Sequence, residues 1–285
     1  KGVVTINKKE QNYQFASDPF ASVHSGYSLA ILLQAPSLLK QIKQLNALGV
    51  YSIIITGHSQ GGALATLCRA YLEYLPSDMV AEKNQFKTYC FANPMVGNKA
   101  FANEYNAMFS ATRTSFSIVN PKDLIHNMPI HYDEDKKFIN AERIVNTISG
   151  KEKFNLKHLG VELFARSFEG MLGKYIGYSN RQIERFVSRA FTSIEMPEYT
   201  KDINYYKTGE IFTIRPFTYP QIAIEKSELY QYNTENLIQD EQGDYYKKEP
   251  SFFQHKPYNY YVGVLQQYFP KDYDSLKRKY LPENL

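Results

Sequence analysis

Residues 55–67, ITGHSQGGALATL, place a single serine, Ser59, between two different sequence patterns. The preceding YSIIIT is a short apolar run typical of a buried strand, and the following GALATLCRAYL is typical of a helix. A G-x-S-x-G sequence at such a junction predicts the sharp strand-to-helix turn that exposes a nucleophilic serine. The alternative is that Ser59 only caps the helix.

Four neighbours complete the motif around Ser59: Gly57, His58, Gln60 and Gly61. The glycines are expected because close packing at the turn leaves little space for side chains. The backbone N–H of Gln60 would lie at the helix N-terminus, where it can donate a hydrogen bond to a developing oxyanion.

A serine needs a histidine that accepts its proton and a carboxylate that orients this histidine. In this type of turn the chain order is serine, acid, histidine. His255, in the loop-like SFFQHKPYNYY, is the favoured base, and its alternative is a structural role against the tyrosines. The other histidines precede or adjoin the serine, follow the acid closely or lie in a helical pattern: His24, His58, His126, His131 and His158.

Asp123 is the favoured acid because it directly follows the strand-like TSFSIVN. Sites on a parallel sheet form at the carboxyl ends of its strands. Asp133 and Asp135, in YDEDKK, lie farther from any strand and are the fallback. The alternative for Asp123 is a loop carboxylate that caps the next turn.

Strand-like and helix-like segments alternate over the first 130 residues. Strands are expected at GVVTI, YSIIIT, FKTYCFA and TSFSIVN, with helix-length segments over residues 23–48, 60–75 and 98–110. This alternation predicts an α/β fold with a mainly parallel sheet covered on both faces. A further strand is expected within residues 210–217, EIFTIRPF.

Residues 136–200, within an expected helical insertion over residues 136–204, show apolar residues at helical spacing. We expect a helical hairpin over residues 150–196 that roofs the acyl pocket as a cap or lid. It would be an insertion into an α/β core made of residues 1–135 and 205–285. Packing on the side of the sheet as extra core is the alternative.

Composition excludes some functional classes. The hydrophobic content of 43% and the charged content of 22% are typical of a soluble globular protein. The formal charge of +4 is spread along the chain, so nothing indicates nucleic-acid binding. Cys68 and Cys90 lie in apolar stretches and are expected to be buried thiols. The start, KGVVTIN, looks processed or truncated, and a secreted or periplasmic location is favoured.

With these residues in view, the chain resembles the class 3, fungal-type lipases. The resemblance rests on four blocks in family order: VHSGY (23–27), ITGHSQGGALATL (55–67), CFANPMVGNKAFA (90–102) and SIVNPKDLIHNMP (117–129). It implies an α/β-hydrolase fold, carboxylic ester hydrolysis, and Ser59, Asp123 and His255 as the catalytic triad.

The chain departs from the family in three places. The arginine-glycine-threonine or -serine motif of the oxyanion strand corresponds to Lys1-Gly2-Val3, so Val3 would supply the second oxyanion N–H. The family's earlier strands are missing, and we expect an N-terminal truncation rather than an incomplete sheet. Asp123 and His255 are 132 residues apart, through a much longer segment than in the family, and the hairpin would fill it as an insertion. The family's lid position is also polar here, which shifts lid duty to the hairpin or indicates a soluble ester.

The predicted function is therefore a serine hydrolase that cleaves a lipid or smaller acyl ester through an acyl-enzyme. A transient lipid surface is a possible partner. The alternatives are a hydrolase-fold binding or scaffold module and an acyltransferase with the same triad. Neither a metal-ligand spacing nor a phosphate loop occurs in the sequence, so we expect no cofactor.

Overall fold

A parallel sheet of four strands forms the centre of the computed structural model. Its strands, in spatial order, are β3 (Ser52–His58), β4 (Gln85–Phe91), β5 (Ser115–Val119) and β7 (Glu210–Thr213). Each neighbouring pair is parallel, which confirms the predicted α/β fold. The structure describes residues 1–6, 8–128, 194–195, 204–233, 237–249 and 252–281.

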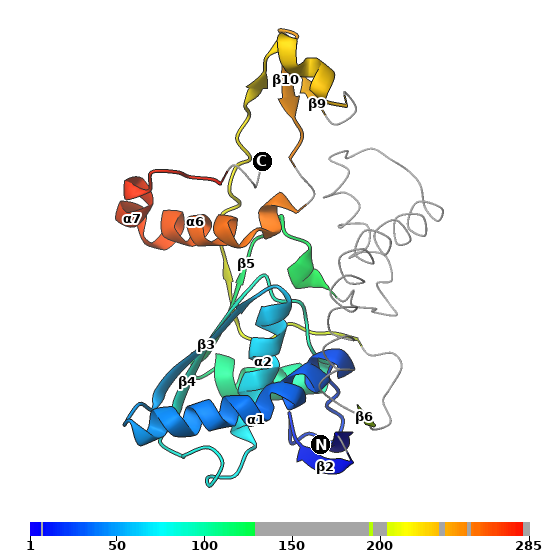
Figure 1. Ribbon diagram of the computed structural model, residues 1–285, viewed down its shortest axis with the longest axis vertical. Coiled ribbons are helices and arrows are strands. Elements are labelled where there is room, and N and C mark those ends of the chain that lie inside the picture. The colour runs from blue at the N-terminus through cyan, green and yellow to red at the C-terminus, as the bar shows by residue number, and fades with distance from the viewer. Residues whose placement is uncertain (7, 129–193, 196–203, 234–236, 250–251, 282–285) are drawn as a thin grey trace.

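Helices pack closely against one face of this sheet, and a further helix lies near the carboxyl ends of its strands (Figure 1). On the covered face, α1 (Ser25–Ala47) and α2 (Gln60–Glu73) pack in one apolar cluster with residues of β3 and β4. The further helix, α6 (Pro257–Tyr268), contributes Tyr260 to a smaller cluster with Ile118 and Ile214. Both cysteines are buried and free, as predicted.

The connection from β4 to β5 is short and helical. It consists of α3 (Lys99–Tyr105) and one π-helical turn, Asn106–Ser110. The side chain of Asn98 caps α3 by accepting a hydrogen bond from the Phe101 N–H, 3.1 Å away. The loop after β5 leads into a 3-10 turn, Ile125–Asn127, so Asp123 lies between this strand and this turn.

The N-terminal strand does not join the parallel sheet, which corrects the prediction for GVVTI. β1 (Gly2–Ile6) pairs antiparallel with β2 (Lys9–Tyr13) and with β6 (Ile194–Glu195). The physical reason is that both edges of β1 are occupied, one by β2 and the other by β6. The reversal into β2 contains Lys8, whose φ is 63°, in the left-handed region. β3 is therefore an edge strand of the described sheet, and Ile54 is 68% exposed there.

A projecting arm, residues 218–249, separates β7 from the 3-10 turn Phe253–His255 (Figure 1). It carries β8 (Ala223–Ile224), β9 (Leu237–Gln239) and β10 (Tyr245–Lys247), which form an antiparallel sheet in the order β8-β10-β9. The sequence gives little sign of it because each strand has only two or three residues. The last helical segment of the described chain is α7 (Pro270–Ser275).

The predicted hairpin over residues 150–196 lies outside the described residues, apart from the short strand β6. Its role as a roof remains a prediction. In the described part of the chain, no helix has the length and apolar character needed to cross a bilayer.

Candidate active site

The turn between β3 and α2 holds Ser59 in a strained backbone conformation. Its φ of 57° and ψ of −127° are unusual for a residue with a side chain. The Ser59 N–H donates to the carbonyl of Phe91 at the end of β4, over 2.8 Å. Ser59 occupies the N-cap position of α2, but its hydroxyl makes no capping hydrogen bond to the helix.

Close contacts with neighbouring atoms explain two of the glycines around Ser59. A Cβ atom on Gly57 would lie 2.2 Å from the Gly61 carbonyl oxygen, and one on Gly62 would lie 2.7 Å from Cβ of Asn93. A Cβ on Gly61 would meet no described atom within 4 Å. The steric reason given above for Gly61 is therefore wrong, because only its backbone is in close contact.

Ser59, His255 and Asp123 form one chain of hydrogen-bond distances. The Ser59 Oγ lies 2.8 Å from Nε2 of His255. The other ring nitrogen of His255, Nδ1, lies 2.8 Å from Oδ2 of Asp123. The side chain of His255 is 17% exposed and that of Asp123 is 1% exposed. The fold thus brings together residues from the ends of β3 and β5 and from the turn before α6.

The carboxylate of Asp123 receives three hydrogen bonds. In addition to His255, the Tyr260 hydroxyl donates to Oδ2 over 2.7 Å and the Ile125 N–H donates to Oδ1 over 3.0 Å. Burial alone would raise the pKa of Asp123, but His255 and these donors outweigh it and lower this pKa below its ordinary value. Burial and the charge of Asp123 raise the pKa of Tyr260, so its hydroxyl keeps the proton that it donates.

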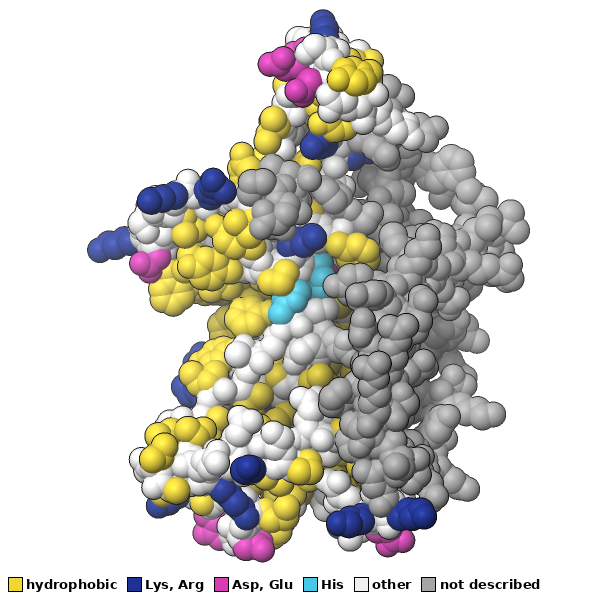
Figure 2. All heavy atoms as spheres, in the orientation of Figure 1, with side chains coloured by type: hydrophobic (Ala, Val, Ile, Leu, Met, Phe, Trp, Pro, Cys, Tyr) yellow, Lys and Arg dark blue, Asp and Glu magenta, His cyan; other side chains and the backbone are white. Residues whose placement is uncertain are grey.

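Two further histidines lie near this chain and are held neutral. The ring centroid of His58 is 4.7 Å from that of His255. Figure 2 shows histidine side chains at the molecular surface below the position of α6. Burial and the neighbouring His255 lower the pKa of His58 to about 4. Burial and the charge of Lys207 lower the pKa of His126 to about 4 as well.

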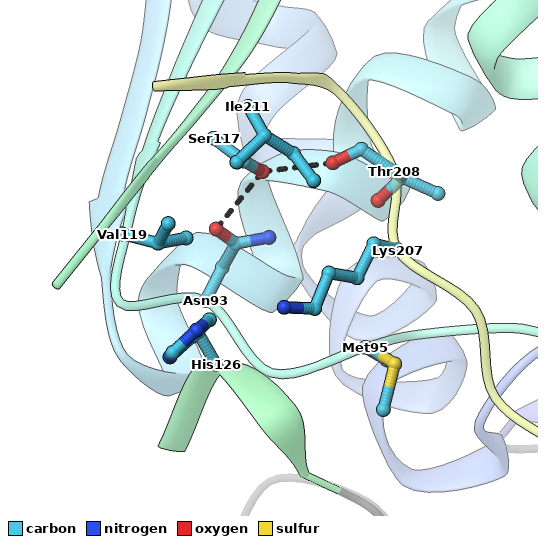
Figure 3. A pocket seen from close by; sticks show the side chains of 8 residues that line it. All are labelled: Asn93, Met95, Ser117, Val119, His126, Lys207, Thr208 and Ile211. Atoms are coloured by element: carbon cyan, nitrogen blue, oxygen red, sulfur yellow. Dashed lines mark hydrogen bonds between the residues drawn. The ribbon is translucent and has the colours of Figure 1, made fainter. Parts of the chain in front are cut away.

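A small cavity with a mixed polar and apolar lining lies beside the loop that carries Asp123 (Figure 3). The Ser117 hydroxyl there donates to the carbonyl of Thr208 over 2.8 Å and lies 3.1 Å from Oδ1 of Asn93. The cavity has room for about one water molecule. None of Ser59, Asp123 and His255 lines it, so it is not the space for an acyl chain.

The two expected oxyanion donors have different surroundings. Gln60 is the first residue of α2, so its N–H belongs to the helix turn whose donors have no partner within the helix. Val3 lies in β1, outside the parallel sheet, and its side chain is 43% exposed. No described hydrogen bond connects Val3 with Ser59, and its proposed donor role remains a prediction. Among the described residues no cluster of three or more acidic, histidine or cysteine side chains could hold a metal ion.

Sequence reasoning missed the residues that hold Asp123 and His255 in place. Tyr260 contacts the acid from α6, and Asn120 connects the acid loop to the turn with His255. The spacing His255 to Tyr260 is visible in the sequence, but nothing there indicates that the tyrosine points back to an aspartate 137 residues away.

Comparison with known proteins supports the resemblance found in the sequence. Residues 3–132 match the family model described as lipase (class 3). A lipase from Caenorhabditis elegans is 33% identical over 79 residues, which are 28% of this chain and 21% of that protein. The matched part thus spans about a fifth of this relative. The class 3 lipase resemblance is confirmed for this part of the chain.

Solved structures of fungal lipases give partial matches. The lipase from Rhizopus microsporus var. chinensis is 29% identical, with 41% of this chain and 40% of that chain covered and a TM-score of 0.34. The Lip2 lipase from Yarrowia lipolytica is 25% identical, with 40% of each chain covered and a TM-score of 0.33. The strand order and the Ser59 turn of the present chain themselves identify the α/β-hydrolase fold.

The glycine contacts predict opposite outcomes for two similar substitutions. Gly57→Ala should lower the free energy of unfolding by about 1 to 3 kcal/mol or more, because its methyl group would collide with the Gly61 backbone. Gly61→Ala, in the first turn of α2, should be neutral or stabilising by up to about 1 kcal/mol. Urea unfolding of both variants measures this. Equal losses would contradict the steric explanation.

Asp123 should make stability depend on pH in a defined window. A lowered pKa in the folded state means that its contribution is complete above the ordinary pKa of 3.8 and is lost as the pH falls through the lower folded value. The difference in free energy of unfolding between the wild type and Asp123→Asn should thus hold steady down to about pH 4 and change below it. Urea titrations between about pH 6 and pH 2 test this. A constant difference over the whole range would show that the Asp123 charge is not stabilised by folding.

Proposed function

We propose that the chain is a serine hydrolase that cleaves carboxylic esters of lipid or acyl substrates. The observation that carries this proposal is the continuous contact from Ser59 Oγ through the His255 ring to Asp123, with 2.8 Å at each step. The match of residues 3–132 to the class 3 lipases supports a lipid ester as substrate.

In the proposed mechanism, Ser59 Oγ attacks the ester carbonyl carbon while its proton moves to Nε2 of His255. The buried carboxylate of Asp123 accepts a hydrogen bond from the Nδ1–H of His255, which fixes the tautomer and stabilises the imidazolium. His255 then returns the proton to the departing alcohol. The acyl-enzyme is hydrolysed in the reverse order, with water as the nucleophile.

The negative oxygen of the tetrahedral intermediate needs donors that are already in place. The Gln60 N–H is the donor that we propose, because it lies at the N-terminal end of α2 and next to Ser59. Val3 stays a second proposed donor, which would require β1 to approach Ser59.

The division of the chain is part of the proposal. β7, from residues 205–285, pairs with β5, from residues 1–135, so the two segments share one sheet. We propose that residues 136–204 form a cap on this core. β6, which belongs to this segment, pairs with β1. This pairing supports a cap that is attached to the N-terminal hairpin.

Substitution of the proposed nucleophile should abolish the activity. Ser59→Ala should lower the rate of p-nitrophenyl ester hydrolysis by at least about 10⁴-fold and leave the unfolding midpoint nearly unchanged, because the hydroxyl is not part of the core. A series of acyl chain lengths would identify the preferred ester. Covalent labelling of the wild type by a fluorophosphonate, with no labelling of Ser59→Ala, is the direct test. Labelling of both proteins would overturn the assignment.

The proposed base can be distinguished from the other histidines. His255→Ala should reduce hydrolysis by several orders of magnitude, whereas His158→Ala should change it little. His126→Ala is a second control, since His126 is buried and makes no described contact with Ser59 Oγ. A larger loss in either control than in His255→Ala would show that the base is misassigned.

A further inference from the structure

Asn120 and Gln254 form a buried amide pair between the two halves of the proposed catalytic chain. Asn120 is 1% exposed and Gln254 is 5% exposed. The Asn120 Nδ2 donates to Oε1 of Gln254 over 2.7 Å and also lies 3.3 Å from the Gln254 carbonyl oxygen. The pair joins segments that are 134 residues apart in the sequence.

The remaining polar atoms of Asn120 shape the loop that presents the acid. Its carbonyl accepts from the Asp123 N–H over 2.9 Å, and its Oδ1 accepts from the Lys122 N–H over 3.0 Å. Its own N–H donates to the hydroxyl of Tyr260 over 3.0 Å, and this hydroxyl donates to Asp123. A change in the position of Asn120 would therefore move the carboxylate.

Gln254 makes several hydrogen bonds next to His255, the proposed catalytic base. Its Nε2 donates to the carbonyl of Phe217 over 2.9 Å and to Oε1 of Glu249 over 2.8 Å. Phe217 directly precedes the arm and Glu249 is its last residue. One amide group, that of Gln254, therefore connects the two ends of the arm. His255 is the next residue, within the same 3-10 turn, Phe253–His255.

We propose that Gln254, through Asn120, is a positioning residue that holds His255 between the acid loop and the base of the arm. This inference rests on the proposed ester hydrolase function. The Gln254 side chain touches neither Ser59 nor His255 in any described hydrogen bond, so it acts through the backbone of the turn. Gln254 binds residues at both ends of the arm. A displacement of the arm would therefore move the turn that carries His255.

The test uses variants that change hydrogen bonding with little change in volume. Gln254→Met removes every side-chain donor and acceptor, and Asn120→Asp removes the donor while keeping an acceptor for Lys122. Each should lower kcat roughly 100-fold, the scale of loss for a misplacement of about 1 Å, with little change in KM. Fluorophosphonate labelling of Ser59 should slow by a similar factor.

A charge-swapped pair gives a readout that a purely structural role would not move. Gln254→Glu faces the Glu249 carboxylate, so it should label slowly. The double variant Gln254→Glu with Glu249→Gln restores an amide-to-carboxylate contact and should recover at least about tenfold of the labelling rate. If Gln254→Met does not fold, the labelling rate of the double variant is the deciding measurement. A double variant that labels no faster than Gln254→Glu would overturn the inference.

Asn98→Ala is the matched control. Asn98 also uses its side chain to connect distant segments, since it accepts from the Ser22 N–H and donates to the Phe20 carbonyl, but it contacts none of the proposed catalytic residues. It should lower the unfolding temperature and leave labelling unchanged. Wild-type labelling rates in folded Gln254→Met and Asn120→Asp would overturn the positioning role. A wild type that is neither labelled nor active would instead overturn the proposed function.

Discussion

The site depends on one strained backbone position, Ser59, where the chain passes from β3 into α2 within a single residue. A conformation of this kind costs about 1 to 3 kcal/mol and persists only when its surroundings fix it. The hydrogen bond to the Phe91 carbonyl and the close approach of the Gly57 and Gly61 backbones supply that restraint. The same turn sets the direction of Oγ and places the Gln60 N–H at the start of the helix.

Unlike Ser59, the acid and the base are not positioned by a local turn, because they are far apart in the sequence. Asp123 and His255 are 132 residues apart, and the fold joins them through side chains that are almost completely buried. Burial makes each unpaired polar group costly, so the carboxylate is stable as an anion only with its three donors in place. The Tyr260 hydroxyl serves both the Asp123 carboxylate and the Asn120 N–H, which links the orientation of the acid to the packing of α6.

The sequence alone predicts the parts of this arrangement that depend on local patterns. Apolar runs and helical spacing are enough to place β3, α2, β4 and β5, and the G-x-S-x-G motif predicts the strained turn. The strand at β1 is predicted from its apolar run, but a single run does not indicate which strand it pairs with. The sheet of the arm is not foreseen, because strands of two or three residues show no periodicity. The Asn120–Gln254 pair is invisible for another reason: amide side chains occur throughout the chain, and only the tertiary fold selects these two as partners.

The four described histidines show why exposure alone does not identify a catalytic base. His24 uses Nδ1 to accept the Tyr27 N–H at the start of α1, and His126 is buried and neutral. The Nε2 of His58 is buried and has no hydrogen-bond partner within the described residues. His255 alone among these four has a hydroxyl at one ring nitrogen and a carboxylate at the other. Proton transfer requires both partners at once, because the carboxylate selects the tautomer whose free lone pair faces the hydroxyl. This chemical requirement therefore distinguishes His255 from His58, whose ring lies beside it.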